Sequence, residues 1–283
     1  MSGLGSGWAL VVIASSLLVG CGGGGGGAPP PKGDGTFRPA PQPLIATGNR
    51  PTAIVTADLD GDGVTDLAVG NHLGDTVSVF RGLGGGAFTP MDLLQLPTSS
   101  GLFDLRAGLI DGDGYLDLVT ANSFTNTVSV FLGDGDGTFT AAPPVTVDAG
   151  TKIHGVALAD FDGNGDLDLA ATALTTDQVS VFLGAGDGTF VFEAAFTVGT
   201  GARQVVAADF DEDGIPDLAT ASFDAGTVSI HLGNGDGSFV PAAGSPVSVG
   251  LRPWNLAIAD FDRDGHLDLA SPGDQVNAVR ILL

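Results

Sequence analysis

Basic side chains are scarce in this chain. Among its 283 residues, Lys and Arg together number 10 against 33 Asp and Glu, so the formal net charge at pH 7 is -23. A surface this acidic repels phosphate backbones and anionic lipid headgroups. The composition therefore excludes nucleic acid or an anionic membrane face as the main partner.

Cysteine and common enzyme motifs are missing as well. Cys21 is the single cysteine, so no disulfide can form within the chain, and bound cations are left as the available staples. The sequence contains no Gly-x-Ser-x-Gly turn, no His-rich zinc cluster and no phosphate loop, and it has only 4 His.

Long apolar runs are also lacking. The run from Trp8 to Val19 is too short to span a bilayer and has the length of a signal-peptide core. It leads into Leu18-Val19-Gly20-Cys21, which resembles a bacterial lipoprotein box, although no Lys or Arg precedes the run. The resemblance implies a signal peptide over residues 1–20, a lipidated Cys21 and a Gly/Pro-rich tether over 21–32. We therefore expect an exported protein held at the cell envelope by its lipid, or a secreted one if Cys21 carries no lipid.

What the chain has in quantity is one acidic loop, written five times. The first copy runs from Asp58 to Asp66, and the closing Asp recurs at Asp117, Asp168, Asp217 and Asp268, in steps of 51, 51, 49 and 51 residues. A fixed internal period of this size is typical of a propeller or another repeat architecture.

Each repeat contains four short β patterns. Residues 52–57 lead into the loop, 67–69 leave it, 76–80 alternate with period two, and a Gly/Asp turn precedes the fourth pattern. No stretch has a clear helical period, so the chain is predicted to be all-β. Units of this kind cannot bury both faces alone and must stack around an axis. The predicted blades cover residues 51–97, 101–149, 151–199, 201–249, and 251–283 together with 33–47.

The two ends of the chain complement each other. The fifth unit lacks a fourth strand, and residues 33–37 (Gly-Asp-Gly-Thr-Phe) match residues 235–239 (Gly-Asp-Gly-Ser-Phe) of the fourth unit. We therefore expect the N-terminal strand to complete the last blade, which would leave no open sheet edge.

Residues 33–283 resemble the FG-GAP/VCBS repeats of integrin-α-like β-propellers. The resemblance implies radial four-stranded blades, with the acidic loop between the first two strands of each. Members of that family more often have seven blades, so five is a departure. It leaves a small closed variant or a truncated larger ring, and the complementary ends favour the closed variant.

The loop chemistry indicates calcium, a hard cation that takes six to eight oxygen ligands. Carboxylates at alternate positions, a backbone carbonyl after the Gly and a closing Asp supply them. The predicted ligands are Asp58, Asp60, Asp62, Val64 and Asp66; Asp111, Asp113, Tyr115 and Asp117; Asp160, Asp162, Asn164, Asp166 and Asp168; Asp209, Asp211, Asp213, Ile215 and Asp217; and Asp260, Asp262, Asp264, His266 and Asp268.

Two details refine this prediction. An EF-hand would need Glu at position twelve of the loop, where this chain has Val69, Thr120 or other non-acidic residues, and it would need flanking helices. In the second loop Leu109 replaces the first ligand, so we expect four calcium sites and a weak or absent fifth.

A ligand face is expected opposite the acidic rim. The residue at the start of the inner strand varies between units, being Thr52, Phe103, His154, Arg203 or Trp254, and Arg252 lies nearby. Aromatic and cationic groups around a central depression suit a glycan or an anionic peptide, whereas simple drift of surface loops would give the same variation.

Three functions remain open at this stage, one of which is a pure scaffold that awaits a partner protein. The preferred one is a monomeric, non-enzymatic binding or adhesion module for glycan or extracellular protein, attached to the membrane only through its lipid. The alternative is a polysaccharide lyase or hydrolase, for which His154, Asp104 and Arg203 are the available acid/base groups.

Overall fold

A computed structural model describes residues 39–40, 44–147, 152–250, 252–274 and 277–283. The expected signal peptide, Cys21, the tether and the strand expected at 33–37 lie outside these residues and stay predictions. In the described part, no helix is long and apolar enough to cross a membrane.

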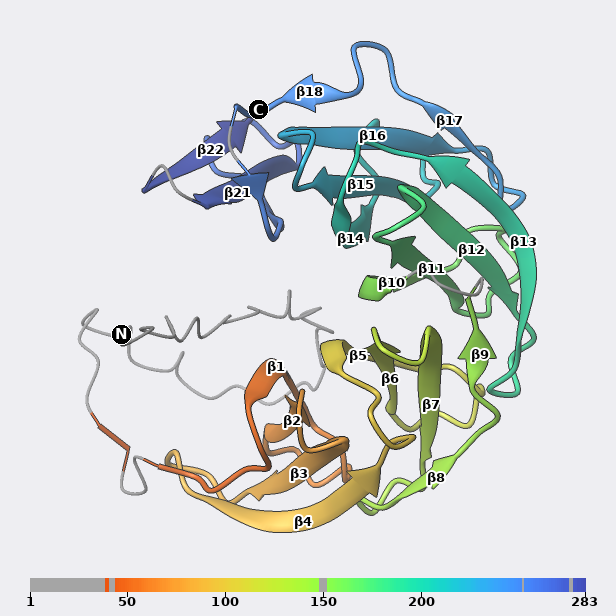
Figure 1. Ribbon diagram of the computed structural model, residues 1–283. Coiled ribbons are helices and arrows are strands. Elements are labelled where there is room, and N and C mark those ends of the chain that lie inside the picture. Colours follow the sequence, from red (N-terminus) through yellow and green to blue (C-terminus); the bar gives the residue numbers. More distant parts are fainter. Residues whose placement is uncertain (1–38, 41–43, 148–151, 251, 275–276) are drawn as a thin grey trace, which may run out of the picture.

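The chain forms five antiparallel sheets arranged around a common centre, a five-bladed β-propeller (Figure 1). Blade one contains β1 (Pro51–Ala57), β2 (Asp66–Asn71), β3 (Thr76–Gly82) and β4 (Phe88–Gln95). Blade two contains β5 (Leu102–Gly108), β6 (Asp117–Asn122), β7 (Thr127–Gly133), β8 (Phe139–Ala141) and β9 (Val145–Thr146). Blade three contains β10 (Ile153–Ala159), β11 (Asp168–Ala173), β12 (Gln178–Gly184) and β13 (Phe190–Thr197).

Blades four and five depart from a plain four-strand order. Blade four contains β14 (Ala202–Ala208), β15 (Asp217–Ser222), β16 (Thr227–Gly233), β17 (Phe239–Pro241) and β18 (Val247–Ser248). Blade five contains β19 (Arg252–Pro253), β20 (Ala257–Ala259), β21 (Asp268–Asp274) and β22 (Ala278–Leu282). Blades two and four therefore have an outer strand in two pieces, whereas in blade five the inner strand is divided.

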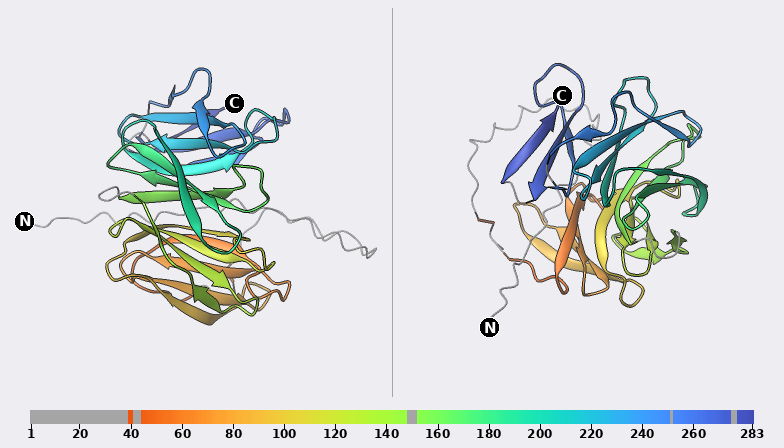
Figure 2. Two further views of the ribbon diagram at one scale, coloured as in Figure 1. Left: turned by 90° about the vertical axis from the view of Figure 1, so that its right-hand side faces the viewer. Right: turned by 45° about the horizontal axis from the view of Figure 1, so that its top comes forward.

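The cores lie between neighbouring blades. Val79 of β3 packs with Leu105 of β5 and Leu118 of β6, and the equivalent apolar layer recurs between blades two and three, three and four, and four and five. Burying one such Val or Leu side chain contributes about 1.5–3 kcal/mol. The inner strands β1, β5, β10 and β14 face the centre in Figure 1, and Figure 2 shows the sheets from two further sides.

The turn between the second and third strands has one backbone requirement in common. It places a residue at positive φ in every blade, and only Gly, Asn and Asp adopt this left-handed conformation readily. The residues are Asp75 (φ 49), Asn126 (φ 57), Asp177 (φ 55), Gly226 (φ 65) and Asn277 (φ 51).

Blade five ends at β22, which within the described residues pairs with β21 alone. Residues 44–47, which were expected to continue the completing strand, form no strand and lie along blade one. The match between residues 33–37 and 235–239 therefore remains the basis for expecting completion of this blade.

Candidate functional site

The acidic loops are shaped by their own carboxylates. In loop one the Gly63 amide donates to Asp58 Oδ2 at 2.9 Å, and the Val64 amide donates to Asp62 Oδ1 at 2.8 Å. Loops three, four and five repeat both bonds. Loop two keeps only the second kind, from Tyr115 to Asp113, because Leu109 has no oxygen to offer.

The residues predicted to give backbone carbonyls lie in these turns. Val64, Tyr115, Asp166, Ile215 and His266 each donate their amide to the carboxylate or amide oxygen two residues earlier. The imidazole of His266 contacts Glu212 of the neighbouring loop, which raises the pKa of His266. The His266 imidazole is thus engaged by Glu212, and only the backbone carbonyl of His266 is left as its predicted ligand atom.

The closing aspartates have a second task that the sequence did not reveal. Asp117 accepts the Ile110 amide at 2.6 Å and the Gly133 amide at 2.8 Å, so one carboxylate ties the start of the loop to the end of the third strand. Asp66, Asp168 and Asp217 make the same pair of bonds, and Asp268 makes the first of them. Burial raises the pKa of Asp66, Asp117, Asp168 and Asp217 more than these bonds lower it. We call this arrangement the carboxylate clamp.

We expect Asp117→Ala to lower the free energy of unfolding by about 2–4 kcal/mol, because two buried backbone amides lose their acceptor. Urea unfolding in excess EDTA would measure this loss with no metal contribution. Asp113→Ala is the matched control in the same loop, since its oxygens are exposed and its loss should cost less than about 0.5 kcal/mol. Equal losses of unfolding free energy in the two variants would show that the carboxylate clamp adds no more stability than an exposed carboxylate of the same loop.

Four of the loops gather carboxylates closely enough to hold a metal ion. Within each group the oxygen atoms lie within 4.8 Å of one another, and the groups are Asp58, Asp60 and Asp62; Asp160, Asp162 and Asp168; Asp209, Asp211 and Asp217; and Asp260, Asp262 and Asp268. Loop two forms no such group in the described chain. Its reduced affinity stays a prediction.

Loop one shows an oxygen that lacks a partner. Oδ1 of Asp58 is buried and accepts no hydrogen bond, a condition that costs free energy unless a cation or water satisfies it. Arg81 of β3 forms an ion pair with Asp60 of this loop. An all-oxygen donor set with an unsatisfied carboxylate fits a hard cation.

The predicted ligand face forms a continuous arc of rings across four blade boundaries. Phe103 stacks on His154 with ring centroids 4.0 Å apart and lies edge-on to His72 at 4.6 Å. The guanidinium nitrogen Nη1 of Arg203 lies 3.3 Å from Nδ1 of His154, and the guanidinium carbon lies 3.8 Å from the centre of the Trp254 ring. We call this set the central arc.

Three residues of the central arc, namely His72, Phe124 and Phe223, were not singled out as site residues from the sequence. Phe223 lies 4.3 Å below the Arg203 guanidinium and edge-on to Trp254, and Phe124 packs against His72. All three follow the second strand of their blades, where the sequence varies, but variation alone does not indicate which side chain turns toward the centre. Arg252 also reaches the Phe223 ring, at 5.3 Å.

The hydrogen bonds fix the tautomers of both histidines. Arginine only donates, so Nδ1 of His154 accepts and its proton is on Nε2. His72 Nδ1 lies 2.9 Å from the Leu102 carbonyl oxygen, which only accepts, so here Nδ1 carries the proton and Nε2 is the basic nitrogen. Burial, aided by the Arg203 charge, lowers the pKa of His154 to about 3, and burial also lowers the pKa of His72. Both rings are neutral at pH 7.

Asp104 is not part of an acid/base set with His154, contrary to the sequence-based alternative. Successive strand residues point to opposite sides, so Asp104 turns inward while Phe103 faces the arc. Its buried carboxylate pairs with Arg106 at 2.8 Å, and it accepts the Val156 amide at 3.1 Å and the Gln204 side chain at 3.2 Å. Asp104 therefore ties the inner strands of blades two, three and four together beneath the arc.

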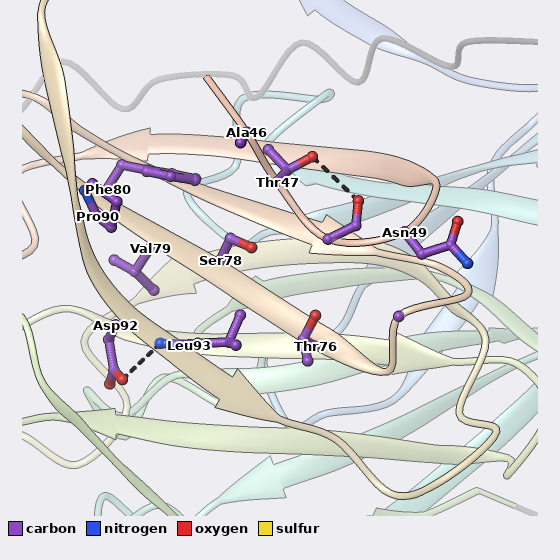
Figure 3. A pocket seen from close by; sticks show the side chains of 12 residues that line it. Ala46, Thr47, Asn49, Thr76, Ser78, Val79, Phe80, Pro90, Asp92 and Leu93 are labelled. Atoms are coloured by element: carbon purple, nitrogen blue, oxygen red, sulfur yellow. Dashed lines mark hydrogen bonds between the residues drawn. The ribbon is translucent and has the colours of Figure 1, made fainter. Parts of the chain in front are cut away.

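A separate hollow of about 440 Å³ lies on blade one (Figure 3). Residues of β3 and β4 form one wall, and Thr47 and Asn49 border the other side. Among the described residues that line it, Asp92 alone is charged, and it accepts a hydrogen bond from the Leu93 amide. The hollow offers no second titratable group, so the central arc is the better candidate for chemistry.

Comparisons with known proteins place the repeat in a family. A model of the FG-GAP-like repeat matches residues 31–69, 58–120, 110–171, 171–220 and 209–271. No curated protein matches the chain.

Solved structures with a similar fold come from several bacteria. They include a protein from Lactobacillus plantarum (TM-score 0.62, 18% identity) and a 6-phosphogluconolactonase candidate from Bacteroides fragilis (0.60, 15%). A third is the periplasmic gluconolactonase of Pseudomonas aeruginosa (0.54, 18%). The alignments cover 85%, 83% and 81% of this chain and 72%, 66% and 56% of those proteins. At such identities the shared feature is the fold.

These neighbours contradict the preferred function drawn from the sequence. The chain was interpreted as a non-enzymatic binding or adhesion module, whereas propellers of similar fold include lactonases, which are hydrolases. The enzyme alternative fits the neighbours better, although they act on lactones rather than polysaccharides by name. The error has a physical origin, because no local motif marks the central arc, which takes its side chains from all five blades.

Proposed function

This chain belongs to the FG-GAP-like repeat family, and from that premise we propose that it is a calcium-stabilised hydrolase that opens the cyclic ester of a sugar acid at the central arc. The observation that carries the proposal is the neutral His154, stacked on Phe103 and held by Arg203. The similar fold of a periplasmic gluconolactonase and of a 6-phosphogluconolactonase candidate supports the choice of reaction.

His154 and Arg203 suit the stabilisation of a developing oxyanion. Nε2–H of His154 is a hydrogen-bond donor whose orientation is fixed by the ring stack and by the bond at Nδ1. A neutral imidazole with a depressed pKa donates without giving up its proton, and the guanidinium adds positive charge beside it. Donors aimed at a carbonyl oxygen in this way lower the barrier to addition of water.

The basic nitrogen is Nε2 of His72. Water would add its oxygen to the ester carbon and pass a proton to this nitrogen; the ring C–O bond then breaks, and the departing oxygen takes the proton. The product is the open hydroxy acid, and no oxidant or reductant is required. Asp104 keeps the strands in place through its bonds to Val156 and Gln204 rather than entering the reaction.

Calcium is the cation that we assign to the four carboxylate groups, because it favours flexible all-oxygen shells. It would be held by protein oxygens on the acidic loops and supply stability rather than chemistry. Its role in hydrolysis is indirect. The loops connect the inner strand to the second strand of each blade, so calcium would act by stabilising the strands that carry the central arc.

Hydrolysis of glucono-δ-lactone and of 6-phosphogluconolactone tests the proposal. We expect the calcium-loaded protein to accelerate acid release, followed by pH-stat at slightly acidic pH where spontaneous hydrolysis is slow. His231→Phe is a suitable control variant because it gives blade four the residue that Phe80, Phe131 and Phe182 provide in the others. Rates equal to the spontaneous rate with both lactones would refute the proposed activity.

A further inference from the structure

Two arginines from different blades meet on one aromatic ring at one end of the central arc. Arg203 starts the inner strand of blade four, and Arg252 belongs to β19 of blade five. Their guanidinium carbons lie 4.3 Å and 5.3 Å from the centre of the Phe223 ring. Gathering two positive charges is unfavourable in isolation and becomes favourable when an anion binds between them.

The aromatic rings fix how these cations are presented. Arg203 lies 3.8 Å from the Trp254 ring centre as well, and the Phe223 and Trp254 rings stand at 88° to each other, so two perpendicular aromatic surfaces hold its guanidinium. One nitrogen of Arg203 also contacts His154, so this bond and the ring contacts fix the Arg203 charge in place. The exposed Arg252 offers the guanidinium edge on which a carboxylate or phosphate accepts a pair of bonds. Arg252 is exposed, whereas Arg203 is half-buried and Phe223 is buried.

The surrounding charge is unusual for this chain. Arg50 and Lys152 lie at the same face, and the charge of Arg50 lowers the pKa of His72 as that of Lys152 lowers the pKa of His154. These two and the paired arginines make four of the 10 basic residues in a protein with a net charge of -23. Asp75, Asp177 and Asp224 lie in turns of the same face, so its basic side chains offset local acid rather than stand alone. Basic groups gathered on one face of an acidic protein still favour anion binding there over the rest of the surface.

We propose that Arg203 and Arg252, with Phe223 and Trp254 as their support, form a subsite that binds an oxyanion carried by the substrate. The anion is a phosphate or carboxylate on a sugar-sized molecule, with its reacting ester carbonyl toward His154. This inference deepens the proposed hydrolase by naming an anionic substrate, and as a binding site it can be tested without any turnover.

The test measures binding of four unreactive probes to the calcium-loaded protein by calorimetry. Glucose 6-phosphate carries phosphate alone, gluconate carries carboxylate alone, 6-phosphogluconate carries both, and glucose carries neither. We expect at least one anionic probe to bind 10-fold or more tightly than glucose, and the two single-anion arms show which group is recognised. The advantage should shrink several-fold as salt rises, because the site is partly exposed.

Arg252→Gln should remove most of this advantage, a loss of 10-fold or more in affinity for the anionic probe. Arg280→Gln is the matched control, since it removes the same charge from an exposed position on β22 of the same blade and should change affinity less than twofold. Equal affinity for glucose and the anions, or equal effects of the two variants, would overturn the subsite. Anion binding that depends on Arg252 without any lactone hydrolysis would instead retain the subsite and refute the proposed reaction.

Discussion

Excess EDTA is expected to lower the melting temperature of this protein by about 10–20 °C relative to ~1 mM calcium. If each site has a dissociation constant near ~0.1 mM, mass action adds about 1.4 kcal/mol per site. Four sites then contribute roughly 5–6 kcal/mol, which is comparable to the whole net stability of a domain. Differential scanning calorimetry with and without chelator gives the measurement.

A variant of loop two in blade two provides a control for this melting experiment. Leu109→Asp supplies the oxygen that loop two lacks, both for a cation and for the Gly114 amide. This variant should gain about 1.4 kcal/mol in ~1 mM calcium and lose most of the gain in EDTA. If EDTA leaves the melting temperature unchanged in both the wild-type protein and the variant, the carboxylate groups do not bind calcium at useful affinity.

Replacing His154 with Phe should reduce kcat for lactone hydrolysis about 10²–10³-fold, because the oxyanion loses a positioned donor. Phe is chosen because it preserves the stack on Phe103, and blade two already has Phe at the equivalent position. Since burial lowers the pKa of His154 to about 3, the ring stays neutral at higher pH. The pH profile above this value should therefore reflect His72 rather than His154. Initial rates across pH, with KM and kcat separated, measure both effects.

His231→Phe is the paired substitution for this experiment. His231 is buried against Phe196 in the outer part of blade four, away from the arc, and its removal should leave kcat within a factor of two. Similar losses in the two variants would show that His154 acts through stability alone. Binding of the unreactive 6-phosphogluconate to His154→Phe checks that the site is still formed.

Much of the fold could be predicted because the repeat states it five times. The period, the alternation in 76–80 and the Gly/Asp turns predicted the blades. The observed strand β3 begins at the predicted residue and ends two residues later than predicted, at Gly82. Breaks in the outer strands of blades two and four and in the inner strand of blade five could not be predicted. They lie beside Pro143 and Pro144, before Val247 at Pro246, and after Pro253, where the chain lacks the amide donor of a strand ladder, but Pro90 lies within β4 without dividing it.

The candidate site was predicted in its parts but not in its assembly. Varying residues at the inner-strand starts pointed to Phe103, His154, Arg203 and Trp254, yet the stack and the shared Phe223 ring exist only once the blades surround the axis. Asp104 shows the opposite failure. Its neighbour faces the arc, while strand alternation turns its own carboxylate into a buried tie between blades.

The carboxylate clamp separates two functions of the acidic loops, strand registration and metal binding. Asp117 keeps both amide bonds in the one loop that has lost its first oxygen, so strand registration in that blade needs no ion. The same bonds at Asp66, Asp168 and Asp217 can hold the strands of their blades in register before any cation binds. We therefore expect strand registration to precede metal binding, and the calcium that we propose for the other four loops to add stability afterwards.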